Sequence, residues 1–134
     1  MNYDTFIDTV AERAGVSPDE AMAHTRATLQ TLSDRLTSGD ALDLSARLAE
    51  PLQAALRPRR ETAERFGLDE FVRRIGERAG VDQPRARSAM GAVFATLCEA
   101  VASGEFDDIM SQLPPDFTDV VQPVIARTGG ARGR

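Results

Sequence analysis

The chain has 134 residues, and its 42% hydrophobic and 28% charged residues are typical of a soluble globular protein with one compact domain or two packed half-domains. Its net charge is −5, which excludes the strongly basic composition of a protein that binds nucleic acid through phosphate contacts alone. A single cysteine excludes an intrachain disulfide, and no apolar run approaches the roughly eighteen residues of a membrane-spanning helix, so we expect a cytoplasmic protein.

Residues 6–58 recur as residues 71–123 without a gap, so residue 6 corresponds to residue 71 and the offset is a constant 65 positions. The clearest match joins Glu12-Arg13-Ala14-Gly15-Val16 to Glu77-Arg78-Ala79-Gly80-Val81. The features that recur are the spacing of apolar residues and the residues that begin and end helices. No cluster of reactive side chains recurs with them. The sequence therefore informs us about architecture far more than about chemistry.

The first predicted helix covers residues 6–14, where apolar residues at i, i+1, i+4 and i+8 form one amphipathic stripe. Gly15 follows at the position of a left-handed residue that ends a helix. The corresponding helix of the second repeat covers residues 71–79 and ends at Gly80.

A long helix follows in each repeat, and the start of the first one has the clearest local signal in the chain. Ser17 is placed to act as N-cap and Glu20 as its partner in a capping box, with Pro18 at the first helical position. This helix is expected to end before Gly39. In the second repeat Asp82 replaces the capping serine and the glutamate is missing, so we expect a weaker helix start there.

Two shorter helices complete each repeat. The third is predicted to begin at Asp40 in the first repeat and at Glu105 in the second, and the fourth covers residues 52–56 and 117–121. No segment alternates polar and apolar residues over a useful length, so no sheet is predicted. The predicted fold class is all-α, with two tandem four-helix repeats packed into one compact helical bundle with pseudo-twofold symmetry.

These elements divide the chain into four parts. Residues 1–58 form the first helical repeat, residues 59–70 form a charged linker that is either helical or a loop, and residues 71–123 form the second repeat. Residues 124–134 are expected to form a flexible tail, because this Gly- and Arg-rich end has nothing to bury.

The side chains that commonly carry chemistry are few and isolated. His24 is the only histidine and has no implied partner, so we expect a solvent-facing or partly packed side chain. Cys98 lies beside the apolar stripe and next to Glu99, which favours a small core thiol over a reactive thiolate. One histidine and one cysteine cannot build the usual zinc site, and the helix dipole explains the acids near Asp40 and Asp107. We therefore predict no catalytic residue, no metal site, no cofactor and no enzyme activity.

Two arginine-rich stretches are candidate contacts for an anionic partner. Arg59 and Arg60 lie in the linker, and Arg73, Arg74 and Arg78 lie on the first helix of the second repeat. For the linker stretch, a solvated linker with local ion pairs is the alternative explanation. The corresponding positions of the first repeat are not basic as a group, so nucleic-acid binding is kept only as the second hypothesis.

Phe106 replaces a small residue, Ala41, at the matching position of the first repeat. An exposed apolar patch on a monomer usually marks an interaction site. We therefore predict that Phe106 belongs to an interaction patch.

Several short segments together resemble one known family. They are the Glu-Arg-Ala-Gly-Val turn, Thr25-Arg26-Ala27, Ser38-Gly39-Asp40, Gly104-Glu105 and Gln112-Leu113-Pro114. The family is the bacterial one known as domain of unknown function 2267, and the resemblance covers about residues 3–121. The second repeat departs from it at Met90-Gly91, where the first repeat has Thr25-Arg26 in the manner of the family. The resemblance implies an all-helical bacterial protein of duplicated build, associated with stress-response proteins, and assigns no reaction.

These observations predict a non-catalytic protein-interaction module or regulator, which the resemblance connects with a stress response. Its partner is expected to be another protein, and formation of a homodimer is left open. A nucleic-acid-binding regulator that uses the arginines of the second repeat is the alternative. A small-molecule or catalytic site in a cleft between the repeats is the third hypothesis.

Overall fold

The computed structural model describes residues 1–57, 63–101 and 105–121. Within these residues the chain is all-α and contains no strand, which confirms the all-α part of the predicted fold. The helices are α1 (Tyr3–Ala14), α2 (Pro18–Arg35), α3 (Ser38–Ser45), α4 (Glu50–Ala55), α5 (Leu68–Ala79), α6 (Gln83–Ala100) and α7 (Glu105–Ser111). A further short helix covers residues 116–121. The predicted tail, together with Arg59 and Arg60 of the linker, lies outside the described residues.

Helix boundaries recur at the offset that the sequence predicts. The bounds of α1 and α5 correspond residue by residue, and so do those of the long helices α2 and α6. Gly15 and Gly80 end the two first helices with φ angles of 69° and 72°, in the left-handed region that favours glycine. The local signals at these helix ends are therefore strong enough to fix the ends from sequence alone. The pseudo-twofold relation between the halves stays a prediction.

The starts of the long helices also follow the sequence. Ser17 and Glu20 form a complete capping box at α2, whereas the Asp82 side chain alone accepts the backbone N–H of Arg85 at α6. Helix α2 ends at Arg35, before Gly39 as predicted, but α3 begins at Ser38 and not at Asp40, so Gly39 lies inside α3. The reason is the N-cap at Thr37, whose side chain accepts the backbone N–H of Asp40 and starts α3 two residues early.

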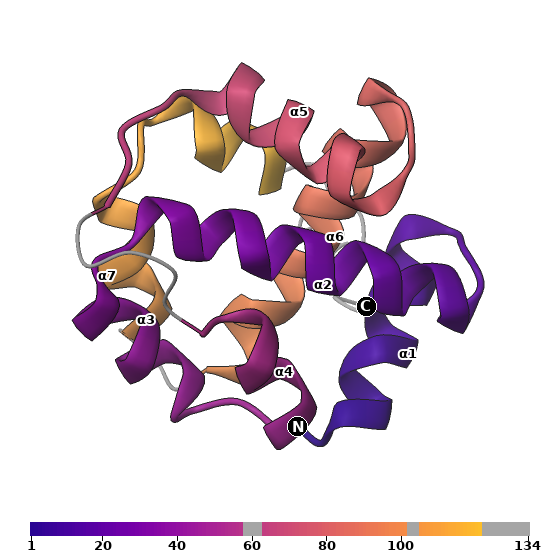
Figure 1. The fold of residues 1–134 in the computed structure, drawn as a ribbon. Helices are drawn as coiled ribbons and strands as arrows, with labels where there is room; N and C mark the ends of the chain where they lie inside the picture. The colour runs from indigo at the N-terminus through magenta and orange to yellow at the C-terminus, as the bar shows by residue number, and fades with distance from the viewer. Residues whose placement is uncertain (58–62, 102–104, 122–134) are drawn as a thin grey trace, which may run out of the picture.

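The two long helices lie at the centre of the molecule, and the shorter helices surround them (Figure 1). Helix α1 contacts both α2 and α6, and α5 likewise contacts both α6 and α2. Each first helix therefore packs on the long helix of its own half and on that of the other half. Here the first half is residues 1–57 and the second half is residues 63–121. One continuous core joins the two halves, and Phe6 and Phe71 occupy corresponding positions in it.

Phe106 lies in this core, so its prediction as an exposed interaction patch is wrong. Its ring meets Phe94 edge to face with 5.7 Å between centroids, and the residue is 2% exposed. The aromatic packing continues from Phe94 to Phe71 and from there to Phe117. The physical reason is that two larger side chains, Phe94 and Phe106, pack together where the first half has Leu29 and Ala41.

Candidate functional site

Arg13 forms hydrogen bonds between the two halves of the protein. From α1 its Nη1 donates to Oγ1 of Thr96 at 3.0 Å, and its Nη2 donates to Oε2 of Glu99 at 2.7 Å, both on α6. The Thr96 hydroxyl donates in turn to the carbonyl oxygen of Ala92, so its lone pairs stay available for the guanidinium. The result is a charge-assisted contact that crosses between halves.

Arg78 makes the corresponding contact in the opposite direction. Its Nη1 donates to Oγ1 of Thr31 at 2.9 Å, and its Nη2 lies 2.8 Å from Oδ2 of Asp34 on α2. These partners stand at the positions that match Thr96 and Glu99 in the repeat. This pairing was not predicted, although arginine, threonine and an acid all recur in the sequence at the same offset.

The other two predicted arginines of α5 are also bound within the chain. Arg73 pairs with Glu70 at 2.8 Å and with Glu77 at 3.2 Å. Arg74 bonds to Glu70 and Asp34, and its guanidinium lies over the ring of Phe66 at 3.9 Å from the centroid. Hydrogen bonds from Arg73 and Arg74 lower the pKa of Glu70 to about 2. The structure thus brings Arg73, Arg74 and Arg78 together on one helix, each paired with acids of the chain itself.

His24 is buried, with 3% of its surface exposed, so the prediction of a solvent-facing or partly packed histidine is wrong. The reason is that α2 is covered by α1, α4, α5 and α6, which leaves little of its surface open. Burial lowers the pKa of His24, an effect that the charge of Glu20 opposes and that of Arg85 reinforces. Its Nδ1 is buried without a hydrogen-bond partner among the described residues.

Cys98 is exposed, so the prediction of a core thiol is wrong. It stands near the end of α6, just beyond the buried Leu97. Partial shielding of the sulfur raises the pKa of the thiol, and the charges of Asp107 and Glu99 raise it further. The thiol is therefore protonated and weakly nucleophilic at neutral pH. Over the described part of the chain, no three residues of His, Cys, Asp and Glu gather as a metal site would require.

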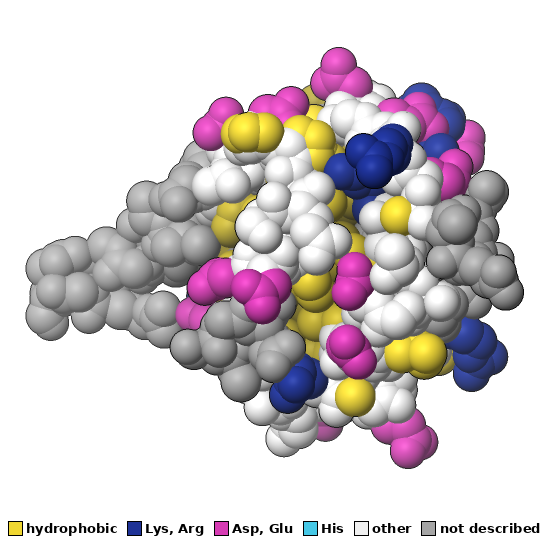
Figure 2. Space-filling model, turned by 90° about the vertical axis from the view of Figure 1, so that its left-hand side faces the viewer, with side chains coloured by type: hydrophobic (Ala, Val, Ile, Leu, Met, Phe, Trp, Pro, Cys, Tyr) yellow, Lys and Arg dark blue, Asp and Glu magenta, His cyan; other side chains and the backbone are white. Residues whose placement is uncertain are grey.

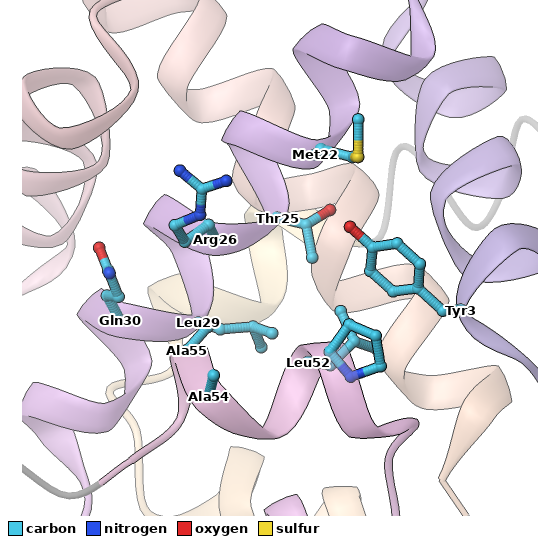
Figure 3. A pocket seen from close by; sticks show the side chains of 10 residues that line it. Tyr3, Met22, Thr25, Arg26, Leu29, Gln30, Leu52, Ala54 and Ala55 are labelled. Carbon is cyan, nitrogen blue, oxygen red and sulfur yellow. The ribbon is translucent and has the colours of Figure 1, made fainter.

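A pocket of about 350 Å³ lies between α2 and α4, with the start of α1 at one end, and we call it the α2–α4 groove. Figure 3 shows its lining side chains, and Tyr3 and Thr25 direct their hydroxyl groups toward one another. Leu29 and Leu52 line it from the two facing helices and are themselves buried. The remaining lining residues are Met22, Arg26, Gln30, Pro51, Ala54 and Ala55.

Thr25 is the unusual member of this groove. The residue is 1% exposed, and its Oγ1 is buried without a hydrogen-bond partner among the described residues. A buried hydroxyl without a partner costs about 1–3 kcal/mol, so such groups are rare in folded proteins. Arg26, the next residue, is exposed and forms no ion pair with any described residue, in contrast to the arginines of α5. The groove thus has an exposed guanidinium at its edge and, beneath its surface, a hydroxyl whose hydrogen-bonding capacity is unused.

The second half does not repeat this polar lining. Thr25 and Arg26 correspond to Met90 and Gly91, and Tyr3 corresponds to Leu68. Leu52 corresponds to Phe117, and apolar side chains are buried at these positions of the second half. The change at Met90-Gly91 is visible in the sequence, but no role was predicted for it. That difference between otherwise matching repeats was the signal for the groove.

The lining of the groove defines what it can do chemically. It contains no Asp, Glu, His or Cys, so the lining supplies no general base and no thiolate nucleophile. Its hydroxyls, one guanidinium and apolar side chains suit binding of a group that joins a carboxylate to an apolar body. This lining favours the hypothesis of a groove that binds a ligand.

The surface around α3 has a different character. Figure 2 shows the face that carries α3 and α7, where hydrophobic side chains reach the surface between acidic ones. Leu42 of α3 is 57% exposed and is, with Met1, one of the two large hydrophobic side chains exposed among the described residues. Acids on the same two helices include Asp40, Asp43 and Asp107. This face is acidic and partly apolar.

Comparison with known proteins identifies the family of the chain and gives no information on its activity. The model of a family of uncharacterised conserved proteins, DUF2267, matches residues 3–120, which include α1 to α7 and the whole α2–α4 groove. No curated protein matches the chain. No helix among the described residues is both long and apolar enough to cross a membrane. The extent of the match shows that the chain belongs to the DUF2267 family.

Proposed function

We propose that the protein is a non-catalytic interaction module or regulator, and that its α2–α4 groove binds a segment of a partner protein. The segment carries a carboxylate next to an apolar side chain. The apolar side chain lies against Pro51, Ala54 and Ala55 of α4. The carboxylate accepts hydrogen bonds from Arg26 and, where it reaches beneath the surface, from Thr25. The observation that carries the proposal is the buried Thr25 hydroxyl without a partner, which faces this groove.

The unpaired hydroxyl of Thr25 favours binding of a hydrogen-bond acceptor. In the free protein its desolvation is not compensated, and a ligand oxygen that reached it would remove that cost of about 1–3 kcal/mol. Arg26 adds a charge-assisted hydrogen bond, and its position at the edge of the groove lets it remain solvated until the partner binds. Both contributions favour a carboxylate over a neutral group.

The surface beyond α4 extends the contact area. A shallow hollow of about 500 Å³ lies on the other side of this helix and shares Pro51 and Ala54 with the α2–α4 groove. The exposed Leu42 lines it. A segment that crossed α4 would thus contact two adjoining concave surfaces, as expected for a peptide longer than a few residues.

No observation favours the nucleic-acid alternative. Arg73, Arg74 and Arg78 are already paired with carboxylates, and the face with α3 and α7 is acidic. The assignment to a bacterial stress response rests on the family resemblance alone, and it remains part of the proposal. A second copy of the chain is one partner to be tested.

The test places a photo-crosslinking amino acid at Ala54, which lines the groove and is exposed. Crosslinked partners are identified by mass spectrometry, and binding of the identified partner is then measured with purified proteins. We expect Thr25→Val and Arg26→Ala each to weaken binding by about tenfold, which corresponds to about 1.4 kcal/mol. Light scattering of the free protein shows whether the partner is a second copy.

Two matched variants serve as controls. Thr28→Val removes another buried hydroxyl without a partner from the same helix, but Thr28 does not line the groove. Arg87→Ala removes an exposed arginine from α6, away from the groove. Both should leave binding unchanged. A partner whose affinity is the same for the wild type, Thr25→Val and Arg26→Ala would overturn the proposal.

A further inference from the structure

A second hollow, of about 420 Å³, lies where the turn between α1 and α2 meets the first turns of α2 and α6, and we call it the His24 hollow. It shares no lining residue with the α2–α4 groove. Gly15 and Val16 of the turn form one side of it, and Arg85 and Ser88 of α6 form the other. The hollow therefore lies at the junction between the two halves.

Two opposite charges line this hollow without pairing with each other. Glu20 comes from α2 and Arg85 from α6, and these two residues occupy corresponding positions of the repeat. The pKa of Glu20 is lowered chiefly by its hydrogen bonds with Ser17 and least by the charge of Arg85, and no salt bridge joins the two residues. Glu20 uses Oε1 to accept from the N–H and hydroxyl of Ser17, which fixes its carboxylate at the edge of the hollow. The Glu20 carboxylate and the Arg85 guanidinium therefore line the hollow as an anion and a cation that are not paired with each other.

His24 gives the hollow a buried polar group that has no partner. The residue lines the hollow and is 3% exposed to solvent. Its Nδ1 atom has no hydrogen bond among the described residues. Its counterpart in the second half is Ala89, so the fold itself does not require a polar side chain there. Because its pKa is lowered, the imidazole is neutral at physiological pH and offers one donor and one acceptor.

We propose that the His24 hollow binds a small zwitterion, a molecule that carries one carboxylate and one ammonium group, as a free amino acid does. The carboxylate pairs with Arg85 and accepts from the hydroxyl of Ser88, while the ammonium group pairs with Glu20. His24 completes the set with a hydrogen bond to the bound molecule. This site is separate from the α2–α4 groove and goes beyond the proposed function.

The charges of the lining decide between ligand classes. A phosphate dianion would meet one cation, Arg85, and would be repelled by Glu20. A simple carboxylate would leave Glu20 unpaired, and a simple amine would leave Arg85 unpaired. A zwitterion pairs both charges at once, and the short apolar contacts from Val16 and Pro84 favour a small side chain.

The test uses L-alanine as the probe, with propionate as its carboxylate-only analogue and ethylamine as its amine-only analogue. Binding is followed by chemical-shift changes of the backbone amides of Gly15 and Val16 and by calorimetry. We expect saturable shifts with L-alanine and affinities at least about tenfold weaker with either analogue. Equal binding of propionate, or no saturable shift with L-alanine, would overturn the proposal.

Single substitutions that remove one charge each test which residues of the His24 hollow bind L-alanine. Arg85→Gln removes the cation from an exposed position, and Glu20→Gln removes the anion while glutamine still supports a capping box. Each should weaken L-alanine binding by about tenfold. Arg87→Gln makes the same charge change two residues further along α6, outside the lining, and should leave affinity unchanged. Affinity that responds to Arg87→Gln as much as to Arg85→Gln would show a general charge effect and would contradict the site.

Discussion

Arg13 donates from Nη1 to Oγ1 of Thr96 over 3.0 Å and so fastens α1 of the first half to α6 of the second. The guanidinium of Arg78 repeats the arrangement on Thr31 of α2 at 2.9 Å. The two contacts differ in burial, because the side chain of Arg13 is 5% exposed and that of Arg78 is 25% exposed. The same arginine-to-threonine hydrogen bond is therefore shielded from water at Arg13 and partly exposed to water at Arg78.

We predict that Thr96→Val lowers the free energy of unfolding by about 1–3 kcal/mol, because it leaves a buried guanidinium N–H without its acceptor. Thr31→Val should cost less, since water can replace the lost acceptor at the more exposed Arg78. Urea unfolding of both variants measures the difference. Thr28→Val is the control, because its hydroxyl has no partner to lose, and it should leave stability unchanged or raise it.

The buried position of Phe106 leads to a second prediction. Phe106→Ala removes a ring that packs edge-on against Phe94 and should lower the free energy of unfolding by about 3–5 kcal/mol. Leu42→Ala removes an exposed side chain and should change it by less than about 0.5 kcal/mol. Chemical denaturation tests both. Comparable effects of the two variants would contradict the burial assigned to Phe106.

The glycines that end α1 and α5 give a third prediction. Gly15→Ala and Gly80→Ala should each lower the free energy of unfolding by about 1 kcal/mol, because alanine is strained at φ angles of 69° and 72°. No atom lies within 4 Å of an added Cβ at either position, so backbone strain is the whole effect. Gly39→Ala, inside α3 and equally uncrowded, should instead stabilise the protein by about 0.5–1 kcal/mol. Thermal unfolding of the three variants distinguishes these signs.

The buried His24 predicts a pH dependence of stability. Its pKa in the folded protein is lowered from the ordinary value of 6.5, chiefly by burial. As the pH falls below 6.5, the unfolded chain binds a proton that the folded chain does not, so stability decreases until the lowered pKa is passed. His24→Asn should remove this part of the dependence, and urea unfolding of both proteins between about pH 8 and about pH 5 measures it. Parallel curves for the two proteins would show that burial does not perturb His24.

Local signals explain which parts of the fold were predictable. The ends of α1 and α5 followed from Gly15 and Gly80, and the start of α2 followed from Ser17 and Glu20. These features depend on residues a few positions apart, whose effects are visible in the sequence. The start of α3 was placed two residues too late, because Gly39 was expected to lie outside a helix and the cap at Thr37 starts α3 before the glycine.

Contacts between distant segments explain the errors. The burial of Phe106 depends on Phe94 of α6, and the burial of His24 depends on the helices that cover α2. Arginine pairing on α5 depends on Asp34, which lies 40 positions before Arg74 in the chain. The α2–α4 groove is equally a product of tertiary packing. Only the mismatch between corresponding positions of the repeats marked it in the sequence.

Because α1 packs on α6 and α5 packs on α2, neither half has a complete hydrophobic core of its own. A fragment with residues 1–57 alone would leave one flank of α1 facing water and would lack the acceptor for Arg13. The complementary fragment would suffer the mirror-image loss at Arg78. As separate fragments, each half would expose the surface that packs against the other half in the intact protein. The covalent connection therefore acts chiefly by keeping the two halves close together, because their surfaces already fit each other.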